Sequence, residues 1–455
     1  MMTQSKYSTP GGLQPCSLEM ADALPGPRQV SPNCALQCAD GDAQIAMEIS
    51  IQYLESTPAT AGISPAEAHR RLRDAFEHVH LSEVLLGWDL DPRVIEACAK
   101  ECTLHGADLY LWQPMLSGHG SFKVHPAWRI VALNGEPAGR ADEKPEFTFM
   151  CPNCAGVMDG VLESLRRALE TGLFQGVFLD RIRLPSPSVD FTRSFGCFCD
   201  ACRAAAECSD LDLSAAQENL VEQLERPEGR RQALSTLLSP RTTDTELAAG
   251  SLWRLLEFRS QSITAFVKTI SSTLADRGFK VGLDCFAPTL TRMVGQDLAA
   301  LAPHADWIKV MTYARAFGVA SLPFELVGFV DWLVAGGETE ASALDCLAQA
   351  TGWTLPGSRE VIRAGGLPGS ILTQEVRRGR SQGAAHFRAG IELLEIPDVS
   401  RLDHRQIQAD AKAVHAAEPD GVVLSWDLWH MPAWRLDLAA SLYGSARCGA
   451  PLADR

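Results

Sequence analysis

The chain has 455 residues, a formal net charge of −15 at pH 7, 46% hydrophobic residues and 21% charged residues. This composition is ordinary for a globular protein with a hydrophobic core, and the acidic balance argues against nucleic acid or an anionic membrane as a partner. No apolar run approaches the ~20 residues that span a bilayer, and the N-terminus lacks the pattern of a secretory signal. We therefore expect a soluble cytoplasmic protein.

The order of apolar and amphipathic segments predicts an α/β fold. Residues 1–42 are rich in Pro, Gly, Ser and Gln without periodicity, which is typical of a disordered tail. Beyond them, short apolar runs alternate with amphipathic segments, the pattern of a parallel sheet covered by helices. Eight runs favour a (β/α)8 TIM barrel over residues 43–447, with an open doubly wound sheet as the alternative. The predicted strands are 45–54, 81–89, 107–116, 176–184, 280–287, 307–314, 391–396 and 421–428.

Several helix starts are marked by capping residues. Ser64, Ser214 and Asp403 are each followed three residues later by Glu or Gln, which predicts capping boxes, and Asp91 precedes a proline.

The segment 186–279 is long enough to hold an inserted helical subdomain. Residues 323–388 carry helical patterns but no clear strand.

The cysteines predict a metal site. Fourteen cysteines in a large chain without a secretory signal favour reduced thiols or metal ligands over disulfides. Cys197, Cys199 and Cys202 have the spacing of a tight turn that supplies three zinc ligands. We expect Cys151 to be the fourth ligand rather than Cys154, because the proline after Cys151 favours an extended backbone, whereas a helix should begin near Cys154. Four thiolates leave no open coordination position, so the metal would be structural.

Polar and aromatic residues gather at the predicted strand ends, where catalytic residues of TIM barrels lie. In chain order they are Trp88, Asp89, Trp112, Asp180, Arg181, Arg183, Asp284, Lys309, Tyr313, Glu395, Trp426, Asp427 and His430. Glycosidic cleavage requires two carboxyl groups, one of them an acid with a raised pKa. We expect Asp180, Glu395 and Asp284 to supply the pair and the other residues to bind substrate.

Each of these roles competes with a structural one. Asp180 and Arg181 could instead form an ion pair that closes the top of the barrel. Asp284 could instead be a buried carboxyl whose oxygens accept hydrogen bonds. Trp88 and Trp112 could be hydrophobic core residues as readily as residues that stack against a sugar. Lys309 could be the partner of a carboxylate in an ion pair.

Strand seven offers two glutamates. Glu392 and Glu395 are three residues apart, so they point to opposite faces of a strand and only one can face the site. We expect Glu395 to do so, because it lies nearer the predicted strand end.

The cysteine cluster after strand four resembles the structural zinc site of the family 42 β-galactosidases. The segment from Gly176 to Pro185 looks like the fourth strand of glycosyl-hydrolase-like barrel proteins. The resemblance implies the barrel, the zinc and a carbohydrate site, and it maps the family's strand-seven nucleophile onto Glu395. This chain has Asp180-Arg181 where that family has its Asn-Glu pair, so the acid/base residue and β-galactosidase activity are not implied.

Three functions follow from these observations. The first is a glycoside hydrolase in which Asp180 works with Glu395 or Asp284. The second is a barrel that binds carbohydrate without a catalytic pair. The third is a lyase or aldolase that forms a Schiff base through Lys309, which needs a lysine with a depressed pKa. A homo-oligomer is left open.

Overall fold

The computed structural model describes residues 47–57, 60, 62–138, 147–239, 250–383 and 386–444. The tail predicted over 1–42 lies outside these residues. The described part confirms the barrel, because eight parallel strands close into one ring in chain order and β1 pairs with β8. The strands are β1 (Glu48–Tyr53), β2 (Glu83–Leu86), β3 (Asp108–Pro114), β4 (Gly176–Asp180), β5 (Lys280–Phe286), β6 (Trp307–Met311), β7 (Phe387–Glu392) and β8 (Gly421–Ser425).

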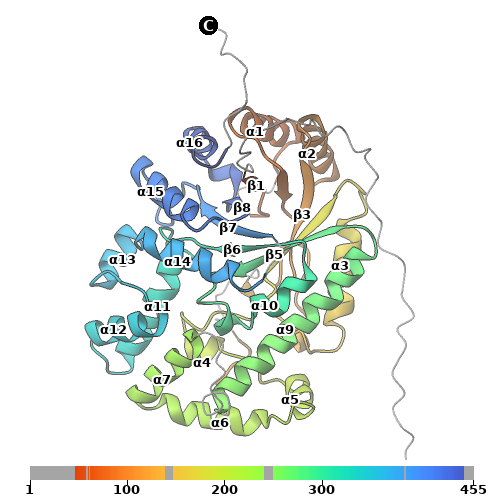
Figure 1. Cartoon of the computed structure of the whole chain (residues 1–455). Helices are drawn as coiled ribbons and strands as arrows, with labels where there is room; N and C mark the ends of the chain where they lie inside the picture. Colours follow the sequence, from red (N-terminus) through yellow and green to blue (C-terminus); the bar gives the residue numbers. More distant parts are fainter. Residues whose placement is uncertain are drawn as a thin grey trace, which may run out of the picture.

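Helices surround the strands, and the predicted helical insertion between β4 and β5 is present, with α4, α5, α6 and α7 lying together below the barrel in Figure 1. The α-helices are α1 (Pro65–His78), α2 (Pro92–His105), α3 (Val157–Ala168), α4 (Phe191–Ser194), α5 (Asp200–Glu207), α6 (Leu213–Leu224), α7 (Pro227–Leu238), α9 (Ser251–Ala275), α10 (Leu298–Leu301), α11 (Leu322–Ala335), α12 (Glu340–Thr351), α13 (Arg359–Gly365), α14 (Gly369–Arg380), α15 (His404–His415) and α16 (Ala433–Tyr443). Short 3-10 turns are η1 (Pro126–Trp128), η3 (Arg292–Val294), η4 (Ala302–His304) and η5 (Leu428–His430).

Three of the four predicted helix starts are confirmed. Ser64 and Asp403 form capping boxes, and the Asp91 side chain accepts a hydrogen bond from the N–H of Arg93. The box predicted at Ser214 is wrong. Asp212 caps α6 instead, two residues earlier, because its carboxylate accepts hydrogen bonds from the N–H groups of residues 214 and 215.

Strand β7 lies four residues earlier than predicted, at Phe387–Glu392 instead of 391–396. Its first half contains Arg388 and Gly390, which do not read as a buried apolar run. The structure explains both residues. Arg388 forms ion pairs at the base of the barrel, and Gly390 leaves room for Lys309, whose Cε lies 2.7 Å from where a Cβ would stand.

The barrel lumen has its own core, separate from the apolar layer between strands and helices. It contains the buried side chains Leu85, Trp88, Tyr110, Trp112, Phe178, Trp307 and Val423. Because strand side chains alternate, residues two positions after Phe178 and Trp307 also point into the lumen, one level closer to the C-terminal ends. Those residues are Asp180 and Lys309. The aromatic core therefore carries a polar layer on the side where barrel active sites lie.

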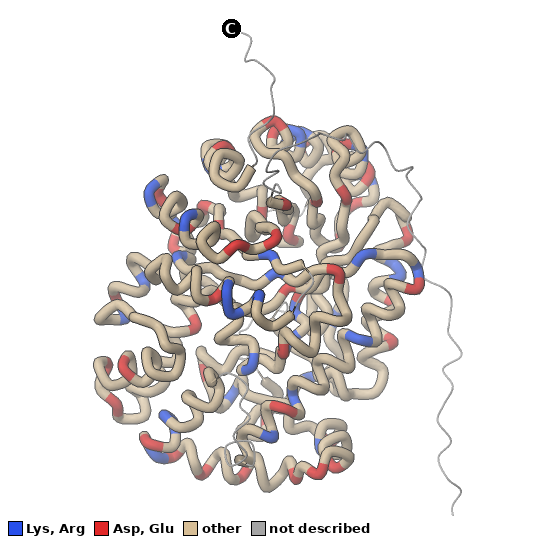
Figure 2. The backbone as a smooth tube through the Cα atoms, in the orientation of Figure 1, with Lys and Arg blue, Asp and Glu red and all other residues tan. Residues whose placement is uncertain are grey.

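Charge and hydropathy add two further observations. Acidic and basic residues are interspersed along the backbone in Figure 2. Within the described ranges, helices are either too short or too polar to cross a membrane.

Candidate active site

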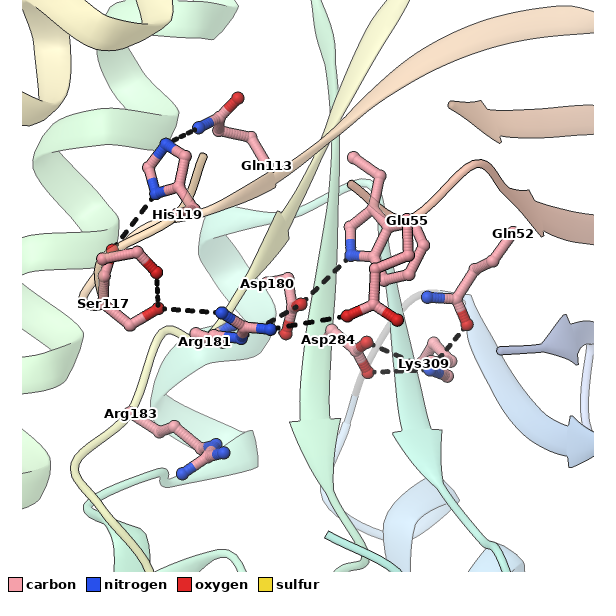
Figure 3. Close-up of polar contacts among 12 residues, drawn as sticks. Gln52, Glu55, Gln113, Ser117, His119, Asp180, Arg181, Arg183, Asp284 and Lys309 are labelled. Carbon is pink, nitrogen blue, oxygen red and sulfur yellow. Dashed lines mark hydrogen bonds and ion pairs between the residues drawn. The ribbon is translucent and has the colours of Figure 1, made fainter. Parts of the chain in front are cut away.

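A polar row crosses three neighbouring strands at the mouth of the barrel. Asp284 on β5 pairs in register with Lys309 on β6, and Leu179 on β4 pairs with Leu283, which sets Asp180 beside Asp284. Figure 3 shows these three side chains together. The sequence placed Asp180 at the end of strand four and Asp284 and Lys309 within strands five and six, and the structure brings the three into one layer.

Asp180 is held by two donors. The indole Nε1 of Trp112 donates to Oδ2 at 3.1 Å, and the backbone N–H of Arg181 donates to Oδ1 at 2.5 Å. Only 6% of the residue is exposed. Trp112 thus orients the carboxylate from inside the lumen, which is a positioning role.

Lys309 is completely buried, and its ammonium contacts Asp284 at 3.0 Å, Gln52 Oε1 at 3.3 Å and the hydroxyl of Tyr313 at 2.7 Å. Burial raises the pKa of Asp284 to about 7, with the negative charge of Asp180 acting in the same direction and Lys309 in the opposite one. Although burial alone would lower it, the pKa of Lys309 is raised, because Asp284 and Tyr313 favour the ammonium. A charged lysine lacks the free amine that a Schiff base needs, so this geometry does not favour the lyase hypothesis.

Arg181 joins Asp180 to a second acidic group. Its backbone has a left-handed φ of 51°. Its guanidinium donates to Ser117 Oγ at 3.2 Å and lies 3.6 Å from Glu55 Oε1 (Figure 3). The Glu55 side chain is 25% exposed, compared with 9% for Asp180 and 4% for Asp284. Glu55 is therefore the carboxyl of this group with most access to solvent.

Sequence reasoning missed several residues of this layer. Glu55 directly follows the segment predicted as strand one, so the rule that selects strand ends points to it once the strand is placed. Gln52 and Ser50 lie on the lumen face of β1, and the alternation of polar and apolar residues along this strand was the available signal. His119 packs against Trp88 and contacts the amide of Gln113, but it lies in a loop where no periodic pattern marks it.

The three predicted tryptophans occupy different surroundings. Trp88 and Trp112 are buried in the lumen core, where their ring centroids lie 5.3 Å apart. Trp426, directly after β8, is partly exposed and lies 5.3 Å from the ring of Tyr313. Of the three, Trp426 has the surroundings that suit stacking against a sugar.

Asp427 lies at the same edge but binds the backbone. Its carboxylate accepts hydrogen bonds from the N–H groups of Leu54 at 3.0 Å, Glu55 at 3.1 Å and Trp429 at 2.9 Å. Burial raises its pKa to about 7. Through these bonds Asp427 ties the end of β8 to the end of β1. The half-buried His430 follows in η5, and burial lowers its pKa.

Glu395 lies beyond the end of β7, is 53% exposed at its side chain and is 3.6 Å from Arg435. The glutamate that ends β7 is Glu392. It is buried, and it accepts hydrogen bonds from the N–H groups of Arg315 at 2.5 Å and Ala316 at 2.7 Å. Burial raises the pKa of Glu392 to about 8. The structure thus separates the two glutamates by a strand end, with Glu392 in β7 and Glu395 beyond it.

Asp89 and Arg183 contact residues outside the polar row. Asp89 accepts hydrogen bonds from the N–H of Ser121 at 2.7 Å and its hydroxyl at 3.0 Å. The guanidinium of Arg183 is buried between the rings of Phe149 and Phe286, at 4.7 and 4.6 Å, and burial lowers its pKa to about 10.

The predicted cysteine site is assembled. The sulfur atoms of Cys151, Cys197, Cys199 and Cys202 all lie within 4.8 Å of one another, a set that could hold a metal ion. Cys151 is 3.3 Å from Cys202 and 3.7 Å from Cys199. In a tetrahedral site with zinc–sulfur bonds of 2.3 Å, sulfur atoms are about 3.8 Å apart, so the spacing fits four thiolate ligands. Cys154 lies outside this set, with its sulfur 3.8 Å from Cys199.

Comparisons with known proteins return only distant structural similarity. No family model and no curated protein matches the chain. A glycoside hydrolase domain of PgaB (BpsB) from Bordetella bronchiseptica is 16% identical over 76% of this chain and 93% of its own, with a TM-score of 0.36. A β-galactosidase from Marinomonas ef1 is 12% identical over 87% and 59%, with a TM-score of 0.47. A class V chitinase from Pseudomonas fluorescens Pf-5 is 12% identical over 87% and 99%, with a TM-score of 0.41. At these identities and scores the likenesses carry no argument about function.

Proposed function

We propose that this chain hydrolyses a glycosidic bond at the C-terminal mouth of its barrel, with Asp180 and Asp284 as the reacting carboxyl pair. The observation that carries the proposal is their position side by side on adjacent strands, in the layer above the lumen core. Adjacent strands are about 4.8 Å apart, so two carboxyls at matched positions can act on the same glycosidic bond.

The surroundings suggest a role for each carboxyl. Asp284, with its pKa raised to about 7, holds the proton that passes to the leaving glycosidic oxygen. Asp180, oriented by Trp112, attacks the anomeric carbon as that bond breaks and forms a glycosyl ester. Water then displaces Asp180 while Asp284 takes a proton from it, which restores both groups. Trp426 offers a ring for the sugar, and Arg181 and Glu55 offer hydrogen bonds.

A set of aryl glycosides and oligosaccharides tests the proposal. Asp180→Asn and Asp284→Asn should each lower the rate of hydrolysis by about 10²–10⁴-fold while the chain stays folded. Asp398→Asn is the matched control, because the Asp398 side chain is 94% exposed and stands apart from the row. Glu395→Gln belongs in the same series, because Glu395 is the alternative partner of Asp180. A full rate in Asp180→Asn would rule out the proposed nucleophile.

Carbohydrate binding without hydrolysis is the second candidate. It is favoured by the contacts of the predicted carboxyls, since Asp180, Asp284, Glu395 and Asp427 each already have a partner. Calorimetric titration with the same oligosaccharides separates the two candidates. Binding with no product, and with no loss of affinity in Asp284→Asn, would support the binding protein.

We further propose that the cysteine cluster holds zinc as a structural ion, with four thiolate ligands and no position left for substrate. The ten cysteines with described placement are all free thiols, which suits a reducing compartment such as the cytoplasm. Zinc content after purification without added metal, measured by mass spectrometry, tests the assignment. About one zinc per chain is expected, and none in Cys197→Ser/Cys202→Ser.

A further inference from the structure

Arg259 on helix α9 is a buried cation without hydrogen bonds. Only 1% of the residue is exposed. None of its three guanidinium nitrogens has a hydrogen-bond partner in the part of the chain that the structure describes. A buried charge is unfavourable unless an opposite charge or hydrogen bonds compensate it, so the surroundings of Arg259 need a source of negative charge.

The cysteine cluster is the candidate for that source. The guanidinium stacks 4.1 Å above the ring of Phe195, two residues before Cys197. Burial lowers the pKa of Arg259 to about 9, and the negative charges of Cys197 and Cys202 act in the opposite direction. The ring contact with Phe195 is favourable, but it supplies neither a hydrogen-bond acceptor nor a net charge.

The same face of α9 supports the cluster through a second residue. Ser262, three residues after Arg259, accepts a hydrogen bond from Asn153 Nδ2 at 3.0 Å. Asn153 Nδ2 also donates to the sulfur of Cys202 at 3.3 Å, and the N–H of Val131 donates to the sulfur of Cys197 at 3.4 Å. N–H groups that point at sulfur favour the thiolate over the thiol, so the surroundings are arranged for anionic sulfur.

Four thiolates around a divalent ion carry a net charge of −2, which is itself unfavourable in a buried site. We propose that Arg259 is the counter-cation of this tetrathiolate site, so that the metal complex and the arginine compensate each other. This inference rests on the metal-binding part of the proposed function. It predicts that Arg259 sets metal affinity without being a ligand, because its nitrogens cannot coordinate a cation while they are protonated.

Competition with a chromophoric chelator measures the affinity of the full chain for zinc, and cobalt substitution reports the thiolate ligands through their charge-transfer absorption. Arg259→Met should bind zinc about 10- to 100-fold more weakly than the unmodified chain, the usual loss when an outer-shell partner is removed. Arg259→Lys keeps the charge and should lose only a few-fold. Lys268→Met is the control, because it removes a positive charge from an exposed position on the same helix.

The outcomes separate the two proposals. If the unmodified chain takes up neither zinc nor cobalt at these thiols, the metal site is wrong and the inference falls with it. If it binds metal and Arg259→Met binds equally well, the counter-cation is wrong while the metal site stands. Should Arg259→Met not fold, Arg259→Gln gives a second neutral side chain, and zinc affinity equal to that of the unmodified chain would again overturn the inference.

Discussion

The central residue of the polar row, Asp284, experiences opposing influences. Burial and the neighbouring charge of Asp180 disfavour its ionised form, whereas the ammonium of Lys309 favours it. Burial is the largest of these effects, so the pKa of Asp284 lies near 7 instead of near 3.8. A carboxyl that titrates near neutrality can both give and take a proton under physiological conditions, which is what an acid/base residue requires.

This shift predicts how hydrolysis depends on pH. The acid must be protonated when the glycosidic bond breaks, and the protonated form of Asp284 dominates below about pH 7. Activity should therefore fall as the pH rises through about 7. The pH profile of kcat/KM on an aryl glycoside measures this limb, and a substrate with a more acidic leaving group should depend on it less. A profile that stays level from pH 6 to pH 9 would exclude Asp284 as the acid.

Some residues of the candidate site could be identified from the sequence, and others could not. Asp180, Asp284, Lys309 and Tyr313 were found because each lies in or directly after an apolar run, where a polar residue stands out. The contacts between them could not be found in this way, because they depend on the register between β4, β5 and β6. Glu55 directly follows the predicted strand one, so the same rule could have selected it, but its contact with Arg181 depends on a loop held by hydrogen bonds to Asp427, far along the chain.

Among the elements, β7 shows where hydrophobic patterning fails. The run from residue 391 to 396 is the more apolar, but the strand begins at Phe387 because Arg388 and Gly390 meet requirements of the lumen. Arg388 lies at the narrow base of the barrel, where its guanidinium pairs with Glu83 and covers the ring of Trp307 at 4.2 Å. The predicted ranges of the other seven strands contain the observed ones.

A substitution at Gly390 tests how β7 packs against Lys309. A methyl group there would lie 2.7 Å from Lys309 Cε and 2.8 Å from the carbonyl oxygen of Val310. Gly390→Ala should lower the free energy of unfolding by about 1–3 kcal/mol, the usual cost of overpacking. Gly357→Ala is the control, because no atom lies within 4 Å of the added methyl group. Urea unfolding of both variants measures the difference, and equal midpoints would show that β7 does not pack against Lys309 as described.

At the scale of the whole molecule, the cysteine cluster joins two distant segments. Cys151 lies in the long connection between β3 and β4, whereas the other three cysteines of the cluster lie in the insertion after β4. Removing a bound metal should therefore loosen both segments at once. The free energy of unfolding should fall by about 4 kcal/mol relative to a solution with free zinc a thousandfold above its Kd. Thermal unfolding with and without chelator measures this, and unchanged curves for a chain shown to have lost its metal would refute a structural role.

The closure of the barrel depends on contacts between its first and last strands. Strand β8 pairs with β1, and Asp427 accepts hydrogen bonds from the N–H groups that follow β1, 373 and 372 positions earlier in the sequence. During synthesis the growing sheet thus has two open edges until the last strand emerges, and each edge exposes backbone groups that other chains can pair with. A nascent chain that stalls before β8 is an aggregation hazard, because its first strand has no permanent partner on one side until β8 is made.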